Sequence, residues 1–174
     1  MQTKNVIVQP YDASWRVAFE AIKEEIENAV GDWIIGVEHV GSTAVEGMSA
    51  KPCIDVDVVI ADYAVFDTVV GKLATIGYFH EGDLGIKERE AFRYEGKPHL
   101  QAHHLYVCPQ KSRELHRHLT FRDFLRSHPE AAEKYSRTKE RAAALYPHDI
   151  NGYMKYKSAC IEELYACCGL GDLS

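Results

Sequence analysis

The chain has 174 residues, a formal net charge of −6 at pH 7, 46% hydrophobic residues and 26% charged residues. This length fits a single domain, and it can bury a core without disulfide or metal cross-links. The acidic balance argues against a broad nucleic-acid-binding surface, which needs an excess of Lys and Arg. No apolar run approaches the roughly 20 residues of a membrane span, so no membrane partner is expected.

The cysteines and the first residues both bear on cellular location. The five cysteines are scattered and include no C-x-x-C pair, so neither a zinc ribbon nor a disulfide framework is expected. They are interpreted as buried or incidental thiols in a reducing compartment. Residues 1–5 show no charged-then-apolar signal region. A cytoplasmic protein is therefore expected.

The first part of the chain predicts alternating strands and helices. An amphipathic helix is expected from Ser14, whose hydroxyl can cap the first turn, to Gly31. A second amphipathic helix is expected from Phe66 to near Gly77. The predicted strands of this part are residues 6–8, 34–40 and 54–60.

The rest of the chain predicts two more strands and then only helices. Residues 81–90 are charged and contain glycine, which indicates a loop. Pro129 suits the first position of a helix. The predicted strands are residues 91–94 and 100–108, and the predicted helices are 112–126, 129–145 and 151–168.

This order predicts one domain over residues 1–174 with an α/β (α+β) fold. A small mixed sheet flanked by helices is expected in a core of about residues 1–108. A C-terminal helical tail is expected over about residues 111–168.

Asp55 and Asp57 lie two positions apart in the predicted strand 54–60. Side chains at that spacing share one face of a strand, and two neighbouring carboxylates repel each other unless a cation lies between them. Mg²⁺, or Mn²⁺ in its place, resolves this repulsion. Mg²⁺ usually takes one or two protein carboxylates and completes its shell with water and substrate phosphate. The alternative interpretation is the solvated face of a half-buried strand.

A Gly-Ser turn precedes these aspartates. Gly41 follows a predicted strand and lets the backbone approach a ligand closely. The Ser42 and Thr43 hydroxyls and nearby N–H groups could hold a phosphate, and Lys51 could add a positive charge. Each motif alone is common, but the two together favour a metal and phosphate site.

Several segments resemble the GrpB-like proteins of the nucleotidyltransferase superfamily. The hallmark of that superfamily is a Gly-Ser pair followed by Asp-x-Asp or Asp-x-Glu. The resemblance covers almost the whole chain, because it ends near Tyr153 and Lys157. Its motifs are EHVGSTAVEG at 38–47, AKPCIDVD at 50–57, HHLYV at 103–107 and FRDFLR at 121–126.

The resemblance implies a nucleotidyltransferase-like core with a defined site. Gly41 and Ser42 would hold the triphosphate of a nucleoside triphosphate, and Asp55 and Asp57 would hold Mg²⁺. A third acid on a later strand often helps to activate the acceptor in active members of this superfamily. The predicted strand 100–108 departs from that pattern, since it has no Asp or Glu.

His103 and His104 stand in that later strand. Adjacent strand residues face opposite sides, so one of the two can point into the site as a metal ligand or proton acceptor. His104 is the candidate catalytic residue beside Asp55 and Asp57. The alternative is that both histidines only form structural hydrogen bonds.

The remaining candidates are polar residues outside these motifs. Arg93, in a predicted strand, could neutralise a phosphate or could lie on the surface. Glu38 could reach the site or pair with a Lys or Arg. Arg122 and Lys157 could face a cleft between core and tail or form a solvated helix face. His118 is expected on the surface.

Three functions follow from these features. The first is metal-dependent transfer of a nucleotidyl group from a nucleoside triphosphate to an unknown acceptor. The second is a non-catalytic module that binds a nucleotide or phospho-metabolite, linked to coenzyme A metabolism, because GrpB-like domains resemble units fused to a coenzyme A biosynthetic kinase. The third is protein interaction through the helical tail.

Overall fold

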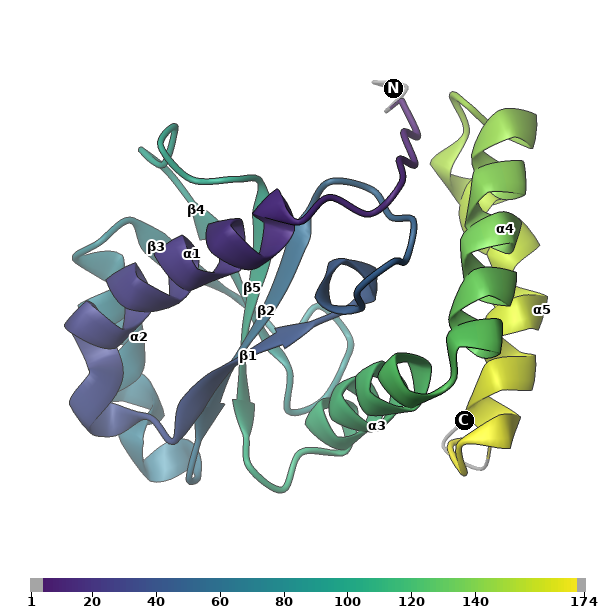
Figure 1. The fold of residues 1–174 in the computed structure, drawn as a ribbon. Coiled ribbons are helices and arrows are strands. Elements are labelled where there is room, and N and C mark those ends of the chain that lie inside the picture. Colours follow the sequence, from purple (N-terminus) through teal and green to yellow (C-terminus); the bar gives the residue numbers. More distant parts are fainter. Residues whose placement is uncertain (1–4, 172–174) are drawn as a thin grey trace.

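A five-stranded mixed sheet lies at the centre of the fold in the computed structural model, which describes residues 5–171 (Figure 1). The sheet has the order β1-β2-β5-β4-β3. β2 and β5 run parallel, whereas β1 with β2, β5 with β4, and β4 with β3 run antiparallel. The strands are β1 Gly36–Val40, β2 Ile54–Ile60, β3 Tyr78–Gly82, β4 Glu90–Tyr94 and β5 His103–Pro109.

The sheet register aligns the polar residues of three strands. Asp55 on β2 lies opposite His104 on β5, and Asp57 lies opposite Glu38 on β1. The even-numbered residues of β2 are buried in the main core. Asp55 and Asp57 therefore point to the other face of the sheet, as their spacing predicts.

Two helices cover the apolar face of the sheet. α1 Ser14–Val30 and α2 Phe66–Ala74 lie on the same side in Figure 1. Phe19 and Ile26 of α1 and Val69 of α2 belong to the same buried cluster as the strand residues. The periodicity of these helices is confirmed, but the predicted cap is wrong. Ser14 is the first helical residue, and its backbone N–H donates to Asp12 Oδ1 at 2.8 Å.

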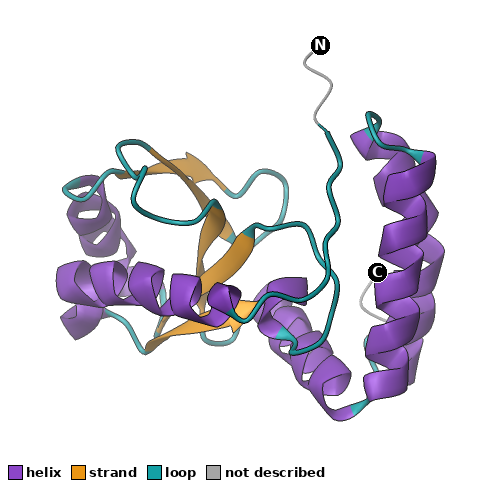
Figure 2. Cartoon of the chain, turned by 45° about the horizontal axis from the view of Figure 1, so that its top comes forward, coloured by secondary structure: helices purple, strands orange, loops and turns teal. Residues whose placement is uncertain are grey.

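Three helices follow the sheet and form the tail. α3 Arg113–Ser127 packs against the polar face, and α4 Pro129–Leu145 and α5 Ile150–Cys167 form an antiparallel hairpin beside it (Figures 1 and 2). A second buried cluster joins Val45 and Met48, which follow the Gly-Ser turn, to Leu125 and Tyr135 of the tail. The tail is thus docked on the segment that precedes β2.

Two predicted elements differ from the structure. Residues 6–8 form no strand, because the nearby ladder is only a single bridge between Gln9 and Ala50. The sequence pattern does not predict the strand β3, and the predicted loop 81–90 includes the last residues of that strand. Gly82 and the polar residue His80 obscure the alternation of that strand.

The prediction about a signal region rests largely on residues 1–4, which lie outside the described residues. No helix within residues 5–171 combines the length and apolar character that a bilayer span requires.

Candidate functional site

The Gly-Ser turn lies directly against Asp55. Gly41 follows β1 with φ +75°, and a Cβ at this position would come 2.2 Å from Asp55 Oδ2. Any larger residue would therefore displace the carboxylate, besides adopting a backbone conformation that favours glycine. The turn continues as a short 3-10 helix, Ser42–Ala44. Thr43 lines the same site, but its hydroxyl is already engaged with His39 Nε2 at 2.9 Å.

Asp55 is open to solvent and is paired with His104. Its side chain is 35% exposed, and its Oδ1 lies 3.0 Å from His104 Nδ1. The hydrogen bonds to Asp55 and to Cys53 raise the pKa of His104 to about 10. His103 points to the opposite face, where it contacts the Tyr78 hydroxyl at 2.8 Å. His104 is thus the histidine that faces the site.

Asp57 is fully buried beneath α3. Its Oδ2 lies 2.6 Å from His118 Nδ1, and its Oδ1 has no hydrogen-bond partner among the described residues. Burial raises the pKa of Asp57, although the bond to His118 opposes the shift. His118 also lies 3.3 Å from Glu114 Oε1. Burial lowers the pKa of His118, but the hydrogen bonds to these two carboxylates outweigh it and raise the value to about 9.

His118 is a site residue that the sequence places poorly, whereas Arg122 lines the cavity between core and tail, one of the two positions expected for it. The expectation of a surface His118 is wrong, because its side chain is only 22% exposed. Arg122 Nη1 donates to Glu38 Oε2 at 2.6 Å and to the His39 carbonyl at 3.0 Å, which joins α3 to β1. The spacing of Glu114, His118 and Arg122 puts all three on one face of α3. That i, i+4 pattern is the available signal.

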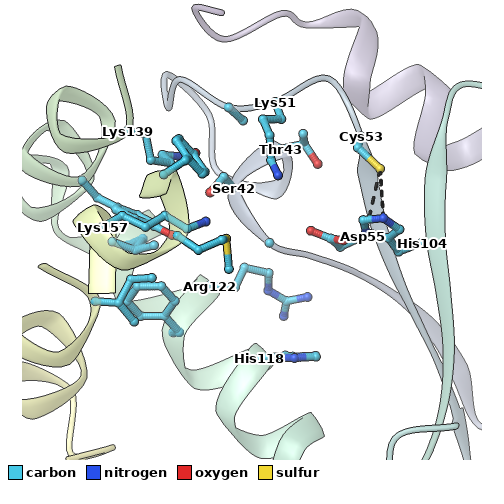
Figure 3. Close-up of a pocket in the computed structure, with 18 of the residues that line it drawn as sticks. Ser42, Thr43, Lys51, Cys53, Asp55, His104, His118, Arg122, Lys139 and Lys157 are labelled. Atoms are coloured by element: carbon cyan, nitrogen blue, oxygen red, sulfur yellow. Dashed lines mark hydrogen bonds and ion pairs between the residues drawn. The ribbon is translucent and has the colours of Figure 1, made fainter. Parts of the chain in front are cut away.

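The site opens into a cavity of about 500 Å³ between the sheet and the tail. Figure 3 shows Asp55 and His104 on the sheet side, and Lys139 and Lys157 on the tail side. Residues from the sheet side include Gly41, Ser42, Thr43, Lys51, Cys53, Asp55 and His104. Residues from the tail include His118, Arg122, Tyr135, Lys139, Tyr153 and Lys157.

The prediction that Arg93 belongs to the phosphate site needs correction. Arg93 is exposed on β4, which is separated from β2 by β5. Its guanidinium lies over the Phe79 ring at 4.7 Å and pairs with Glu95. It is not among the residues that line the cavity. Its position in a predicted strand suggests a place beside the site, but its side chain faces solvent.

The residues present fit a divalent cation in part. Asp55 and Asp57 offer the oxygen ligands that Mg²⁺ prefers, and the unpartnered Asp57 Oδ1 is a buried acceptor that lacks a donor. Within residues 5–171, no cluster of three or more His, Cys, Asp or Glu is arranged to hold a metal. The chain would therefore supply at most two carboxylates, and water and phosphate oxygens would complete the shell.

The fold is shared with solved structures of other proteins. It resembles the MgGTP-bound structure of Cid1 poly(U) polymerase with a TM-score of 0.51 and 11% sequence identity, over 78% of this chain and 44% of that one. The sheet and its flanking helices thus form a nucleotidyltransferase-like fold.

A crystal structure of GrpB from Enterococcus faecalis is more similar, with a TM-score of 0.75 and 30% identity over 91% of this chain and 99% of that one. The GrpB protein family profile matches residues 5–166. The chain belongs to the GrpB family.

Several similar curated proteins are longer than this chain. UPF0157 protein PA4798 of Pseudomonas aeruginosa is 35% identical over 160 residues, and UPF0157 protein YqkA of Bacillus subtilis is 33% identical over 152 residues. These matches cover 90% and 87% of this chain, but only 65% and 44% of the respective relatives. A dephospho-CoA kinase of Mycolicibacterium paratuberculosis is 25% identical over 179 residues, which cover 90% of this chain and 44% of that protein.

Proposed function

We propose that the cavity binds a nucleoside triphosphate with Mg²⁺ or Mn²⁺ and that the protein transfers the nucleotidyl group to an unknown acceptor in the cytoplasm. The observation that supports this most is the contact between the Gly41 backbone and the Asp55 carboxylate, which open together into one cavity. A phosphate held at the turn would lie beside the carboxylate that holds the metal. The fold it shares with the MgGTP-bound polymerase is consistent with this arrangement.

Each residue of the proposed site has a distinct task. Backbone N–H groups of the turn and the Ser42 hydroxyl would hold phosphate oxygens, and Lys51 would add a positive charge. Thr43 would orient the turn, because its hydroxyl is bonded to His39. The metal would be held by Asp55 and Asp57 and would neutralise charge on the phosphates.

In this proposal His104 does not act as a general base. The paired carboxylate of Asp55 keeps His104 protonated at neutral pH, since its pKa is raised to about 10. We propose that His104 orients Asp55 and compensates its charge. β5 carries no Asp or Glu. A group other than an acid on this strand would therefore activate the acceptor.

Calorimetric titration tests the site. The protein is titrated with ATP and Mg²⁺, and the Asp55→Asn and Asp57→Asn double variant is titrated under the same conditions. We expect binding by the natural protein and a loss of at least about tenfold in the variant, since each charged partner contributes about 1.5–3 kcal/mol. Unchanged affinity in the variant would show that the nucleotide binds elsewhere.

A binding module without catalysis is the second candidate. The observation that favours it is the match to a dephospho-CoA kinase, in which this domain would be an additional part of a longer enzyme. The two functions differ in pyrophosphate release. Binding of nucleotide with no pyrophosphate release across a panel of acceptors would support the module, and release above background would support the transferase.

A further inference from the structure

Three lysines from separate segments line the cavity, one from the sheet side and two from the tail. Lys51 precedes β2, Lys139 lies on α4 and Lys157 lies on α5. Figure 3 shows Lys139 and Lys157 facing the Gly-Ser turn, with Lys51 above it. Within the described residues, no carboxylate lies at ion-pair distance from any of the three. Lysines are mostly exposed and seldom buried without an acidic partner, so three that share one cavity without such a partner are unusual.

Tyr153 lies beside two of these lysines, Lys51 and Lys157. It is fully buried, and its hydroxyl has no hydrogen-bond partner among the described residues. The Nζ atoms of Lys51 and Lys157 lie 5.4 Å and 4.9 Å from the centroid of its ring. Tyr153 also lines the cavity. A buried donor without an acceptor, on a ring that lies beside two cations, is suited to an anionic oxygen.

Lys139 is buried, whereas Lys51 and Lys157 are partly exposed. Its side chain is 2% exposed, its Nζ donates to the Ser49 carbonyl, and it lies 4.4 Å from the Tyr135 ring centroid. Burial and the nearby Lys157 lower its pKa to about 7. Burial and Lys51 lower the pKa of Lys157 to about 8. The group thus carries unfavourable electrostatic energy that an anion would relieve.

We propose that Lys51, Lys139, Lys157 and the Tyr153 hydroxyl form a metal-independent site for a chain of linked phosphates, and that such a ligand tightens the existing docking of the tail on the core, a tightening that we call closure. This inference rests on the proposed function, in that the same cavity takes a triphosphate. It adds that the phosphate chain is recognised by lysines without the metal. A single phosphate carries at most two negative charges, whereas linked phosphates match three lysines.

The closure follows from where the lysines come from. Lys51 belongs to the segment between the Gly-Ser turn and β2, whereas Lys139 and Lys157 belong to the two helices of the hairpin. Without a shared anion, like charges on opposite walls repel each other. A ligand that contacts all three joins the two walls. The hairpin and residues 45–53 should then exchange their amide hydrogens more slowly.

Metal-free titration of the full chain tests the site. Inorganic tripolyphosphate, ATP and AMP are each titrated by calorimetry at pH 7 in excess EDTA. We expect tripolyphosphate and ATP to bind and AMP to bind at least about tenfold more weakly. Tighter binding of ATP than of tripolyphosphate would identify the nucleotide as the ligand, and equal or weaker binding would identify the phosphate chain alone. Equal affinities for AMP and tripolyphosphate would overturn the requirement for linked phosphates.

Four variants separate this site from the metal site. Lys157→Gln and Lys51→Gln should each weaken metal-free tripolyphosphate binding by about tenfold or more, and Tyr153→Phe should weaken it by a smaller factor. Lys155→Gln, on an exposed position of the same helix, is the matched control and should leave affinity unchanged. A common loss in Lys155→Gln and Lys157→Gln would indicate general charge attraction and overturn the site.

Asp55→Asn distinguishes failure of this inference from failure of the proposed function. It should not weaken tripolyphosphate binding in EDTA, because it keeps all three lysines and removes a negative charge from the cavity. If tripolyphosphate binds only with Mg²⁺ and Asp55→Asn abolishes that binding, the lysine site is overturned while the metal site stands.

Hydrogen exchange tests the closure, because α4, α5 and residues 45–53 should gain protection with tripolyphosphate in the natural protein but not in Lys157→Gln. Tight binding without that protection would overturn the closure.

Discussion

At the residue scale, the two aspartates of β2 lie in different electrostatic environments although they share a face of the sheet. Asp55 is 35% exposed at the cavity, whereas Asp57 is fully buried and bonded to His118. The difference comes from α3, which covers one aspartate and leaves the other open. Their spacing in the sequence predicts the shared face, but only the docking of a distant helix decides that Asp55 lies open at the cavity and that Asp57 is covered.

Alanine substitutions should separate the two aspartates by stability. Asp57→Ala breaks a buried ion pair and leaves His118 with Glu114 alone, so we expect a loss of about 3–5 kcal/mol in the free energy of unfolding. Asp55→Ala removes a partly exposed pair and should cost about 0–1 kcal/mol. Denaturant unfolding measures both values. Equal losses would contradict the burial of Asp57.

Gly41→Ala should disturb the site more than its backbone conformation alone explains. Its Cβ would meet Asp55 Oδ2 at 2.2 Å, so we expect loss of nucleotide binding together with lower stability. Gly47→Ala is the matched control, since Gly47 also has a positive φ, +83°, but a Cβ there would meet no atom within 4 Å. Calorimetry should show that Gly47→Ala binds normally. Equal binding by both variants would refute the contact.

Lys157→Met should stabilise the ligand-free protein at pH 7. Lys51 and Lys139 face Lys157 from the other walls, and Asp55 is the acid that acts on it from β2. Because its pKa falls from 10.5 to about 8 on folding, the unfolded chain binds more protons between these values. The stability of the natural protein relative to the variant should therefore rise with pH across that window.

Thermal unfolding of both proteins from pH 7 to pH 10.5 measures this difference. The advantage of the variant should be largest at pH 7, where each kcal/mol corresponds to about 2–4 °C in the midpoint, and it should shrink as pH rises. A difference that stays constant with pH would mean that Lys157 has an ordinary pKa in the folded protein.

At the element scale, α3 joins the tail to the sheet through its polar face. Arg122 bonds to Glu38 and the His39 carbonyl on β1, and Arg126 Nε donates to the Ala44 carbonyl at 2.9 Å. The same helix places His118 on Asp57. The helix that docks the tail is therefore also a wall of the site, so a change in its docking should reach the ligand.

Arg122→Ala should loosen this docking. We expect a loss of about 1–3 kcal/mol, because the two hydrogen bonds that the guanidinium donates to β1 are removed. We also expect faster hydrogen exchange in α3 and β1. Arg137→Ala is the control, since Arg137 is 76% exposed and pairs with Glu133 along α4. That variant should change stability by less than about 0.5 kcal/mol. Equal exchange in the two variants would show that Arg122 does not anchor the helix.

The elements differ in how far their sequence predicts them. β2 and α4 begin and end at the predicted residues, because an apolar β-branched run and a first-turn proline mark them clearly. β3 escapes prediction because Gly82 and polar residues interrupt it. The sequence does not predict the position of His118 either, because that position depends on contact with Asp57, which is 61 positions away. Local pattern identifies elements, and the contacts between distant elements complete the site.

At the scale of the whole molecule, charge is distributed unevenly. The chain carries a formal net charge of −6, yet its cavity is lined by Lys51, Lys139, Lys157, Arg117 and Arg122. An acidic protein with a basic cavity is suited to an anionic ligand of limited size, because the field is concentrated where low-dielectric walls surround it. The acidic surface disfavours a long nucleic acid. The architecture therefore supports a small phosphorylated ligand between sheet and tail.

Binding of Mn²⁺ tests the central claim most directly, because its paramagnetism reports the bound ion without catalysis. Water proton relaxation is measured with Mn²⁺ in the presence and absence of ATP, for the natural protein and for Asp55→Asn. The proposed site predicts that ATP tightens Mn²⁺ binding in the natural protein and that Asp55→Asn loses this effect. Equal Mn²⁺ binding by the two proteins, with ATP present, would contradict a metal and triphosphate site at Asp55.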